Sequence, residues 1–101
     1  MKTLNDIQQE IGEWSTKTFG PPRAQSKILH MQREVEELLL KPGDIFEMAD
    51  ILILLLDIAR TAGHSANDLV ITVQEKMEIN KKRNWGNPDK NGVVEHVEDG
   101  D

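Results

Sequence analysis

The sequence contains no cysteine and no tyrosine, and only two tryptophans and two phenylalanines occur among its 101 residues. Without cysteine the chain can form no disulfide framework, no zinc–thiolate site and no thiol nucleophile. This composition fits a reducing compartment, so we expect a cytoplasmic protein. At this length we expect one domain, whose core is small enough that oligomerisation could supply a good part of the buried surface.

Long apolar runs are also missing. The longest uninterrupted one, residues 51–56, is far shorter than the about 20 residues that a transmembrane helix needs. The first 11 residues lack the apolar centre of a signal peptide. We therefore expect no membrane partner.

Positive charge is scarce, because 12 lysines and arginines stand against 18 acidic residues and leave a net charge of -6. Proteins that bind nucleic acid generally do so through Lys and Arg that neutralise phosphates, so we expect no nucleic-acid partner. The sequence also lacks a P-loop, a dinucleotide-binding glycine motif, an EF-hand loop and a G-x-S-x-G motif. Any chemistry has to come from the acidic residues and what they bind.

What the sequence does contain is helical periodicity. Stretches that alternate apolar and polar residues, as half-buried strands do, are nearly absent, so the predicted fold class is all-α. Glycine and proline interrupt the pattern, and Ser65 with Asp68 resembles a capping box after Gly63. The short connections predict antiparallel neighbours. The predicted helices cover residues 4–18, 24–40, 45–62 and about 65–84.

The predicted helices end near residue 86. We expect residues 1–86 to form the all-α domain and residues 87–101 to form an acidic C-terminal tail that is mobile or used in contacts. The third predicted helix is apolar nearly all round, which indicates that a second subunit covers part of it. The bundle is therefore expected to be completed by oligomerisation.

Two acidic pairs carry the strongest functional signal. Glu34 with Glu37, and Glu47 with Asp50, are each three residues apart, so each pair projects from one face of its helix. Four carboxylates on neighbouring helices would repel one another unless a cation lay between them, and Mg²⁺ prefers such oxygen ligands. The pattern predicts a divalent-metal site. The alternative is a solvated acidic strip on an amphipathic helix.

Other residues around these pairs have less definite roles. Glu36 falls on the opposite side of its helix and is expected to be a solvated charge, whereas Asp57 shares the stripe of Glu47 and is expected to support the site or the fold. His30, one turn before Glu34, suggests a core residue or a supporting hydrogen-bonding residue rather than a catalytic base. Trp14 suggests a core residue more than a stacking platform, and so does Phe19.

A basic group lies on the fourth predicted helix. Lys76, Asn80 and Arg83 recur at helical spacing and share one face, which we expect to point toward the bundle. Lys and Arg suit phosphate oxygens, and Asn can donate to a phosphate as well. The alternative is that basic residues near a helix C-terminus complement its dipole, and this is the favoured interpretation for Lys81 and Lys82.

The acidic segments resemble the MazG-like nucleotide pyrophosphohydrolases, which carry E-E-x-x-E and E-x-x-D motifs on adjacent helices. The matching segments are residues 33–37 and 47–50, with Arg33 in place of the first acid. Residues 30–38 resemble the phage and prophage dATP/dGTP pyrophosphohydrolase branch, where that position is commonly not acidic. The resemblance covers about residues 29–86.

The resemblance implies a four-helix MazG-like bundle that assembles as a homodimer or homotetramer. It also implies hydrolysis of a (d)NTP to the (d)NMP and pyrophosphate, in nucleotide-pool control or house-cleaning, with Mg²⁺ or, alternatively, Mn²⁺ as cofactor. Glu34, Glu37, Glu47 and Asp50 would hold the metal, with Glu37, or else Glu34, as general base. Lys76, Asn80 and Arg83 would bind the substrate phosphates. The alternative function is a catalytically silent helical dimer that acts as a regulatory or assembly module.

Overall fold

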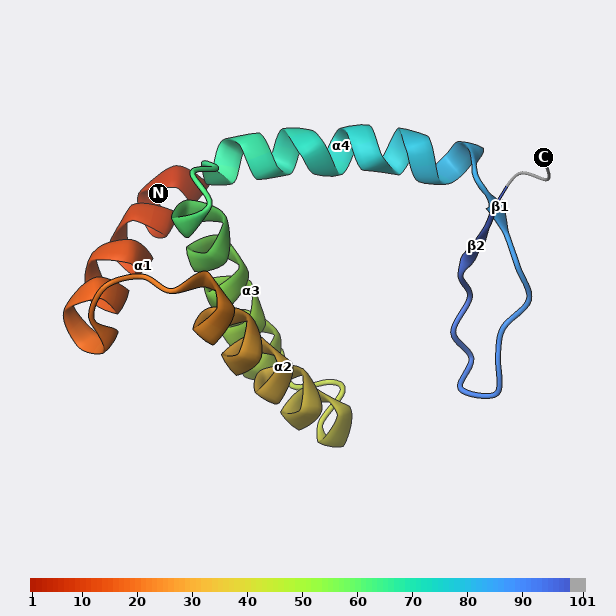
Figure 1. Cartoon of the computed structure of the whole chain (residues 1–101), viewed down its shortest axis with the longest axis horizontal. Helices are drawn as coiled ribbons and strands as arrows, with labels where there is room; N and C mark the ends of the chain where they lie inside the picture. The colour runs from red at the N-terminus through yellow and green to blue at the C-terminus, as the bar shows by residue number, and fades with distance from the viewer. Residues whose placement is uncertain (99–101) are drawn as a thin grey trace. The chain divides into compact units, whose positions relative to one another are not determined.

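The computed structural model describes residues 1–98, in which the chain forms four helices followed by a short β-hairpin (Figure 1). The predicted all-α class is confirmed, and the predicted helix ends agree with the observed ones to within two residues. No helix of the described part is long and apolar enough to cross a membrane. The elements are α1 (Leu4–Phe19), α2 (Ala24–Leu40), α3 (Ile45–Thr61), α4 (Ala66–Lys82), β1 (Asn84–Trp85) and β2 (His96–Val97).

Local hydrogen bonds explain where the helices begin. The Thr3 hydroxyl accepts from the Asp6 backbone N–H at 3.1 Å, and the Asp6 carboxylate accepts from the Thr3 N–H at 3.0 Å. Asp44 caps α3 by accepting from the Phe46 N–H at 2.9 Å. Of the capping box predicted before α4, the structure shows the hydrogen bond in which the Ser65 hydroxyl accepts from the N–H of Asp68, at 3.0 Å. Each cap satisfies a backbone donor that a helix start leaves unpaired.

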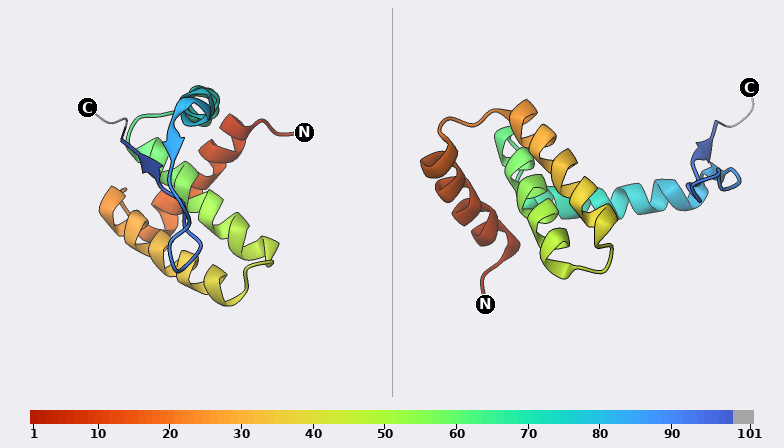
Figure 2. Two further views of the ribbon diagram at one scale, coloured as in Figure 1. Left: turned by 90° about the vertical axis from the view of Figure 1, so that its right-hand side faces the viewer. Right: turned by 90° about the horizontal axis from the view of Figure 1, so that it is seen from below.

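Helix α3 is central to the first compact unit, Met1–Leu69, where it packs against both α1 and α2. Helices α2 and α3 lie side by side and antiparallel, as predicted from the tight turn that joins them (Figure 2). The core of this unit is small: Ile11, Leu56 and Ala66 are buried together. The positive φ of 87° at Gly63 lets the chain leave α3 and enter α4 within a few residues.

A buried glutamine joins three helices of this unit. The Gln8 side-chain amide donates from Nε2 to the carbonyl oxygens of Leu56 and His64, both at 3.0 Å. Its Oε1 accepts from the Ala66 backbone N–H at 2.8 Å. Gln8 thus ties α1 to α3, to the turn after α3 and to the start of α4 through hydrogen bonds to backbone groups.

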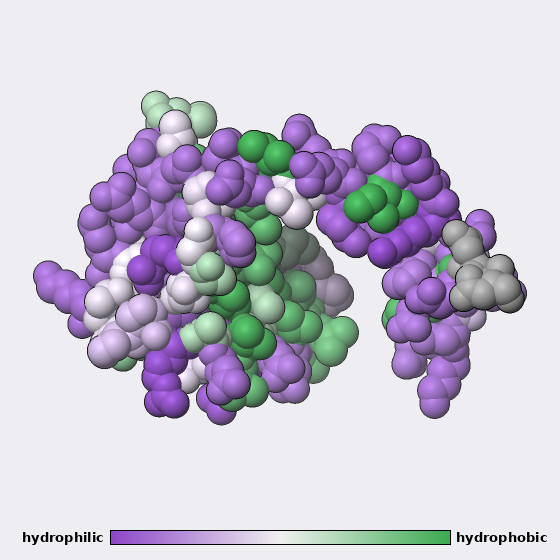
Figure 3. All heavy atoms as spheres, turned by 45° about the horizontal axis from the view of Figure 1, so that its top comes forward, coloured by the Kyte–Doolittle hydropathy of each residue, from purple (hydrophilic) through white to green (hydrophobic). Residues whose placement is uncertain are grey.

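Many apolar side chains of the first unit remain at the surface (Figure 3). The expectation that Trp14 and Phe19 belong to the core is wrong for this subunit, because 55% of Trp14 and 61% of Phe19 are exposed. Their rings contact edge to face, with centroids 5.3 Å apart. Helix periodicity indicates which side chains share a face, and the tertiary structure decides whether that face is covered. The exposed large apolar residues of α3 are Ile45, Phe46, Met48, Leu52, Ile53 and Leu55.

The second unit, Val70–Asp101, holds the rest of α4 and the hairpin. Strand β1 pairs antiparallel with β2, with Trp85 opposite His96. The loop between them is organised by Asp89, whose carboxylate accepts from the N–H groups of Asn91 and Val93. This hairpin is not predicted from the sequence pattern, because two-residue strands are too short to show alternation. The division at residue 86 stays a prediction, and the end of the expected tail, residues 99–101, lies outside the described residues.

Candidate metal centre

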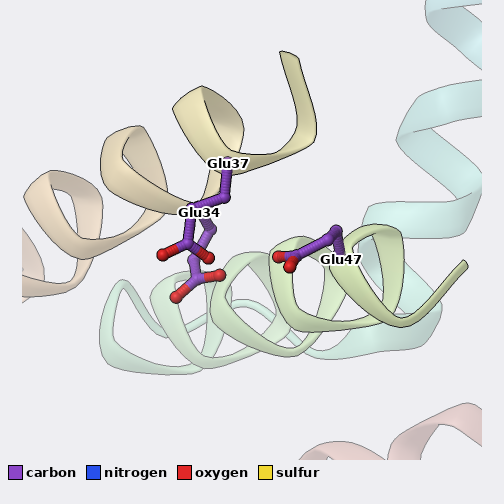
Figure 4. Close-up of side chains that lie close together, drawn as sticks. All are labelled: Glu34, Glu37 and Glu47. Atoms are coloured by element: carbon purple, nitrogen blue, oxygen red, sulfur yellow. The ribbon is translucent and has the colours of Figure 1, made fainter. Parts of the chain in front are cut away.

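Three of the four predicted acids meet between α2 and α3. Glu34 and Glu37 project from α2 and Glu47 from α3, and their carboxylates face one another across the two helices (Figure 4). One oxygen from each lies within 4.8 Å of the others. The tight turn after α2 creates this meeting, because it places the last turns of α2 beside the first turns of α3. Glu37 and Glu47, which are about ten residues apart in the sequence, are thereby brought close together in space.

Two oxygens of this acidic cluster, defined as Glu34, Glu37 and Glu47, have no hydrogen-bond partner in the described part of the chain. Glu34 Oε2 and Glu47 Oε2 are buried and accept no hydrogen bond from any residue among 1–98. A buried carboxylate oxygen without a partner is expensive, and such atoms need an explanation. Hard oxygen donors that converge in this way fit Mg²⁺ or Mn²⁺. A solvated strip, the alternative interpretation, would not require buried oxygens.

The electrostatics of the cluster are repulsive without a cation. Burial raises the pKa of Glu34, and so do the hydrogen bond with Glu37 and the negative charges of Glu37 and Asp50. Burial also raises the pKa of Glu47, together with the charges of Glu37 and Glu34. His30 opposes the shift of Glu34 when protonated, since its Nε2 lies 3.3 Å from Glu34 Oε1. His30 is exposed and so is not a core residue, and its supporting role toward Glu34 stays a prediction.

The fourth predicted ligand, Asp50, lies one turn beyond Glu47 on α3. Its side chain is exposed and does not belong to the group of oxygens within 4.8 Å. Its charge nevertheless acts on Glu34, and both residues line the same cavity. Its role as a metal ligand stays a prediction.

The predicted phosphate-binding residues lie in the second unit. Lys76 is exposed, whereas Asn80 and Arg83 are half-buried. The Asn80 carbonyl accepts from the Trp85 indole N–H at 2.9 Å, which ties the end of α4 to the hairpin. Their role in binding the phosphates of the substrate stays a prediction.

A cavity of about 460 Å³ adjoins the cluster within the first unit. It reaches from Glu34 and Asp50 at one end to the aromatic pair Trp14 and Phe19, between α1, α2 and α3. Its size falls in the range of small-molecule sites, which combine apolar walls with a few polar groups. Its other lining residues are Ile11, Ser15, Pro21, Arg23, Ser26, Lys27, His30, Ile53, Leu54 and Asp57.

A buried ion network contributes Lys27, Ser15 and Asp57 to the wall of this cavity. Lys27 Nζ lies 2.5 Å from Asp57 Oδ2 and donates to the Ser15 hydroxyl at 2.7 Å. Arg60 donates from Nε and Nη2 to Asp57 Oδ1, at 3.1 and 2.9 Å. Burial alone would raise the pKa of Asp57, but the hydrogen bonds from Lys27, Ser15 and Arg60 lower it overall. Asp57 therefore supports the fold through cations rather than joining the acidic cluster.

These opposite shifts predict how the stability of the metal-free protein depends on pH. Glu34 and Glu47 hold protons in the folded state where the unfolded chain has lost them, so stability rises as pH falls from neutral toward their ordinary pKa of 4.5. Asp57 shows the reverse, so its stabilisation is lost as pH falls below its ordinary pKa of 3.8. We expect the melting temperature in chelator to pass through a maximum in mild acid.

The matched control for this pH profile is the double variant Glu34→Gln with Glu47→Gln. Its melting temperature should no longer rise as the pH is lowered from neutral, while the loss of stability in stronger acid should remain. A profile in which wild type and double variant are parallel would contradict the assigned electrostatics. Thermal unfolding followed by circular dichroism over this pH range provides the measurement.

The architecture is that of a MazG-like pyrophosphohydrolase. The structure is similar to the Cyanophage S-2L MazG-like pyrophosphohydrolase bound to dGDP and three catalytic Mn²⁺ ions per active site, with a TM-score of 0.78 and 31% identity. The similarity covers 96% of this chain and 99% of that one. The chain belongs to the dATP/dGTP pyrophosphohydrolase family, whose model matches residues 7–100. The resemblance drawn from the acidic segments is thereby confirmed.

Two phage proteins are among the relatives that the chain matches. A dATP/dGTP diphosphohydrolase of Salmonella phage PMBT28 is 38% identical over 99 residues, which are 97% of this chain and 33% of that protein. A dATP/dGTP diphosphohydrolase of Cyanophage S-2L is 32% identical over 97 residues, or 94% of this chain and 89% of that protein. The chain thus spans about a third of the first relative and nearly all of the second.

Proposed function

We propose that this protein is a divalent-metal-dependent nucleoside triphosphate pyrophosphohydrolase that converts a (d)NTP into the (d)NMP and pyrophosphate. The supporting observation is the acidic cluster, with two buried oxygens that have no hydrogen-bond partner among residues 1–98, beside a cavity of suitable size that Glu34 also lines. The names of the phage relatives favour dATP and dGTP as substrates. Nucleotide-pool control or house-cleaning, in the cytoplasm, is the role that we propose for this activity.

In this proposal Glu34, Glu37, Glu47 and Asp50 hold Mg²⁺ or Mn²⁺. A cation bound there would neutralise the polyphosphate and make a neighbouring water more acidic. Glu37 is the exposed member of the acidic cluster, so it can take the proton of the attacking water and release it to solvent. The water oxygen bonds to phosphorus on one side of the α–β bridge, and the bond from that phosphorus to the bridging oxygen breaks. Lys76, Asn80 and Arg83 would bind the phosphate oxygens.

The activity is tested by incubating the protein with each dNTP in the presence of Mg²⁺, Mn²⁺ or a chelator. Pyrophosphate and the dNMP should appear in equal amounts, only with metal, and fastest with dATP or dGTP. The rival function, a catalytically silent helical module, predicts no product and no metal-dependent rise in melting temperature. Release of inorganic phosphate instead of pyrophosphate would contradict cleavage at the α–β bridge.

We also propose a homodimer or homotetramer, in which a second copy covers exposed apolar side chains. The support is the number of such side chains on α3 and, in the second unit, on α4, including Val73 and Met77. Sedimentation should give a particle of at least two subunits, and Leu52→Glu on α3 should shift it toward the monomer. Gln32→Glu, at an exposed polar position of α2, is the control. A monomer at all concentrations would contradict this proposal.

A further inference from the structure

Lys27 is a buried cationic residue that the proposed reaction does not use. It lies on α2, is only 9% exposed, and lines the cavity beside the acidic cluster. Its ammonium group carries three N–H bonds, two of which go to Ser15 and Asp57. Among residues 1–98 the third has no partner. A buried ammonium donor at a cavity wall is available to a bound molecule.

The charge of Asp57 alone does not explain why Lys27 is buried, because Arg60 already supplies a counter-charge to Asp57 through two hydrogen bonds. The group made of Lys27, Asp57 and Arg60 therefore holds two positive charges against one negative charge. Ser15 and Asp57, both buried, fix two directions of the tetrahedral ammonium and so set the third. This part of the cavity wall can therefore donate a hydrogen bond to an acceptor on a bound molecule.

The position of the acidic cluster orients the molecule that would enter. If the phosphates and their cation lie at Glu34 and Asp50, the rest of the nucleotide extends along the cavity past Trp14 and Phe19. These rings, with the apolar walls Ile53 and Leu54, suit a planar base. Adenine and guanine share acceptor nitrogens on the ring, N7 and N3, although their exocyclic groups differ. A single fixed donor can therefore accept both purines.

We propose that Lys27 is a specificity-determining residue, whose third ammonium N–H donates to a ring nitrogen that adenine and guanine have in common. The inference rests on the proposed function, since that function places a nucleotide in the cavity. Lys27 reads the base and takes no part in breaking the phosphoanhydride bond. Its loss should therefore weaken the binding of purine nucleotides more than it slows their turnover.

The test compares dATP with 7-deaza-dATP and 3-deaza-dATP, each of which lacks one ring acceptor. Binding to wild-type protein is measured by calorimetry with metal present, and kcat and KM are measured separately. One of the two analogues should bind about 10-fold or more weakly, as expected for a lost hydrogen bond to a charged group. Equal binding of dATP and both analogues, or no binding of dATP, would overturn the proposal.

Lys27→Met removes the donor and keeps the length of the side chain. In this variant the discrimination between dATP and the weaker analogue should disappear, while Lys17→Met, at an exposed position of α1, should leave it unchanged. Persistent discrimination in Lys27→Met would overturn the role of Lys27. If Lys27→Met does not fold, Ser15→Ala, which frees the ammonium from one fixed partner, should reduce the discrimination, and unchanged discrimination in Ser15→Ala would overturn the role of Lys27. Purine binding without pyrophosphate release would overturn the proposed function and leave the inference standing.

Discussion

Replacing Glu47 or Glu37 by glutamine is expected to lower the turnover of dATP by at least about 100-fold. The loss of a residue that only supports a metal ligand already costs about 10- to 100-fold, and these carboxylates are proposed as ligands themselves. Glutamine keeps the shape of the side chain but removes the charge that holds the cation. The measurement is pyrophosphate release at saturating metal and dATP, with folding checked by circular dichroism.

Glu36→Gln provides a matched control, because Glu36 lies on the same helix as Glu37 and is exposed outside the acidic cluster. It should retain wild-type turnover. Glu47→Gln should also melt at a higher temperature than wild type without metal, since burial and like charges raise the pKa of Glu47. With metal added, its melting temperature should rise less than that of wild type. Full activity, or an undiminished metal effect, would contradict the assignment of Glu47 as a ligand.

The fold and the acidic cluster were predictable because their causes are local. Glycines, prolines and capping residues set the helix ends, and a spacing of three residues places Glu34 and Glu37 on one face. A tight turn then brings Glu47 beside them, which requires only that consecutive helices pack antiparallel. For these features neighbouring residues carry most of the information.

The cavity and its ion network depend on contacts between distant segments. The Lys27–Asp57 pair joins residues 30 apart, and the Gln8 side chain reaches carbonyls 48 and 56 residues away. Periodicity placed Asp57 on the stripe of Glu47, but it gave no reason to choose Lys27 as the partner. A lysine on an amphipathic helix normally lies at the surface, so its burial is visible only when α1, α2 and α3 are assembled.

Asp57→Asn is expected to lower the free energy of unfolding by about 3–5 kcal/mol, the usual cost of removing one partner from a buried ion pair. Asp57 is 2% exposed and accepts hydrogen bonds from both Lys27 and Arg60, so the variant leaves the buried ammonium of Lys27 without its anion. Denaturant unfolding at neutral pH provides the measurement. In a protein with so small a core, a loss of this size would leave a substantial fraction of the molecules unfolded.

Two control variants separate the effect of losing the buried ion pair from a general sensitivity of the subunit to substitution. Glu10→Gln removes the exposed ion pair between Glu10 and Lys2, whose 2.9 Å distance resembles that of the buried contacts, and it should change stability by less than about 1 kcal/mol. The double variant Asp57→Leu with Lys27→Met replaces both buried charges by apolar groups and should regain much of the stability lost in Asp57→Asn. If the double variant is less stable than Asp57→Asn, then Lys27 stabilises the fold through contacts other than its ion pair with Asp57. If it is as stable as wild type yet binds dATP more weakly, the buried pair serves ligand recognition at no net gain in folding.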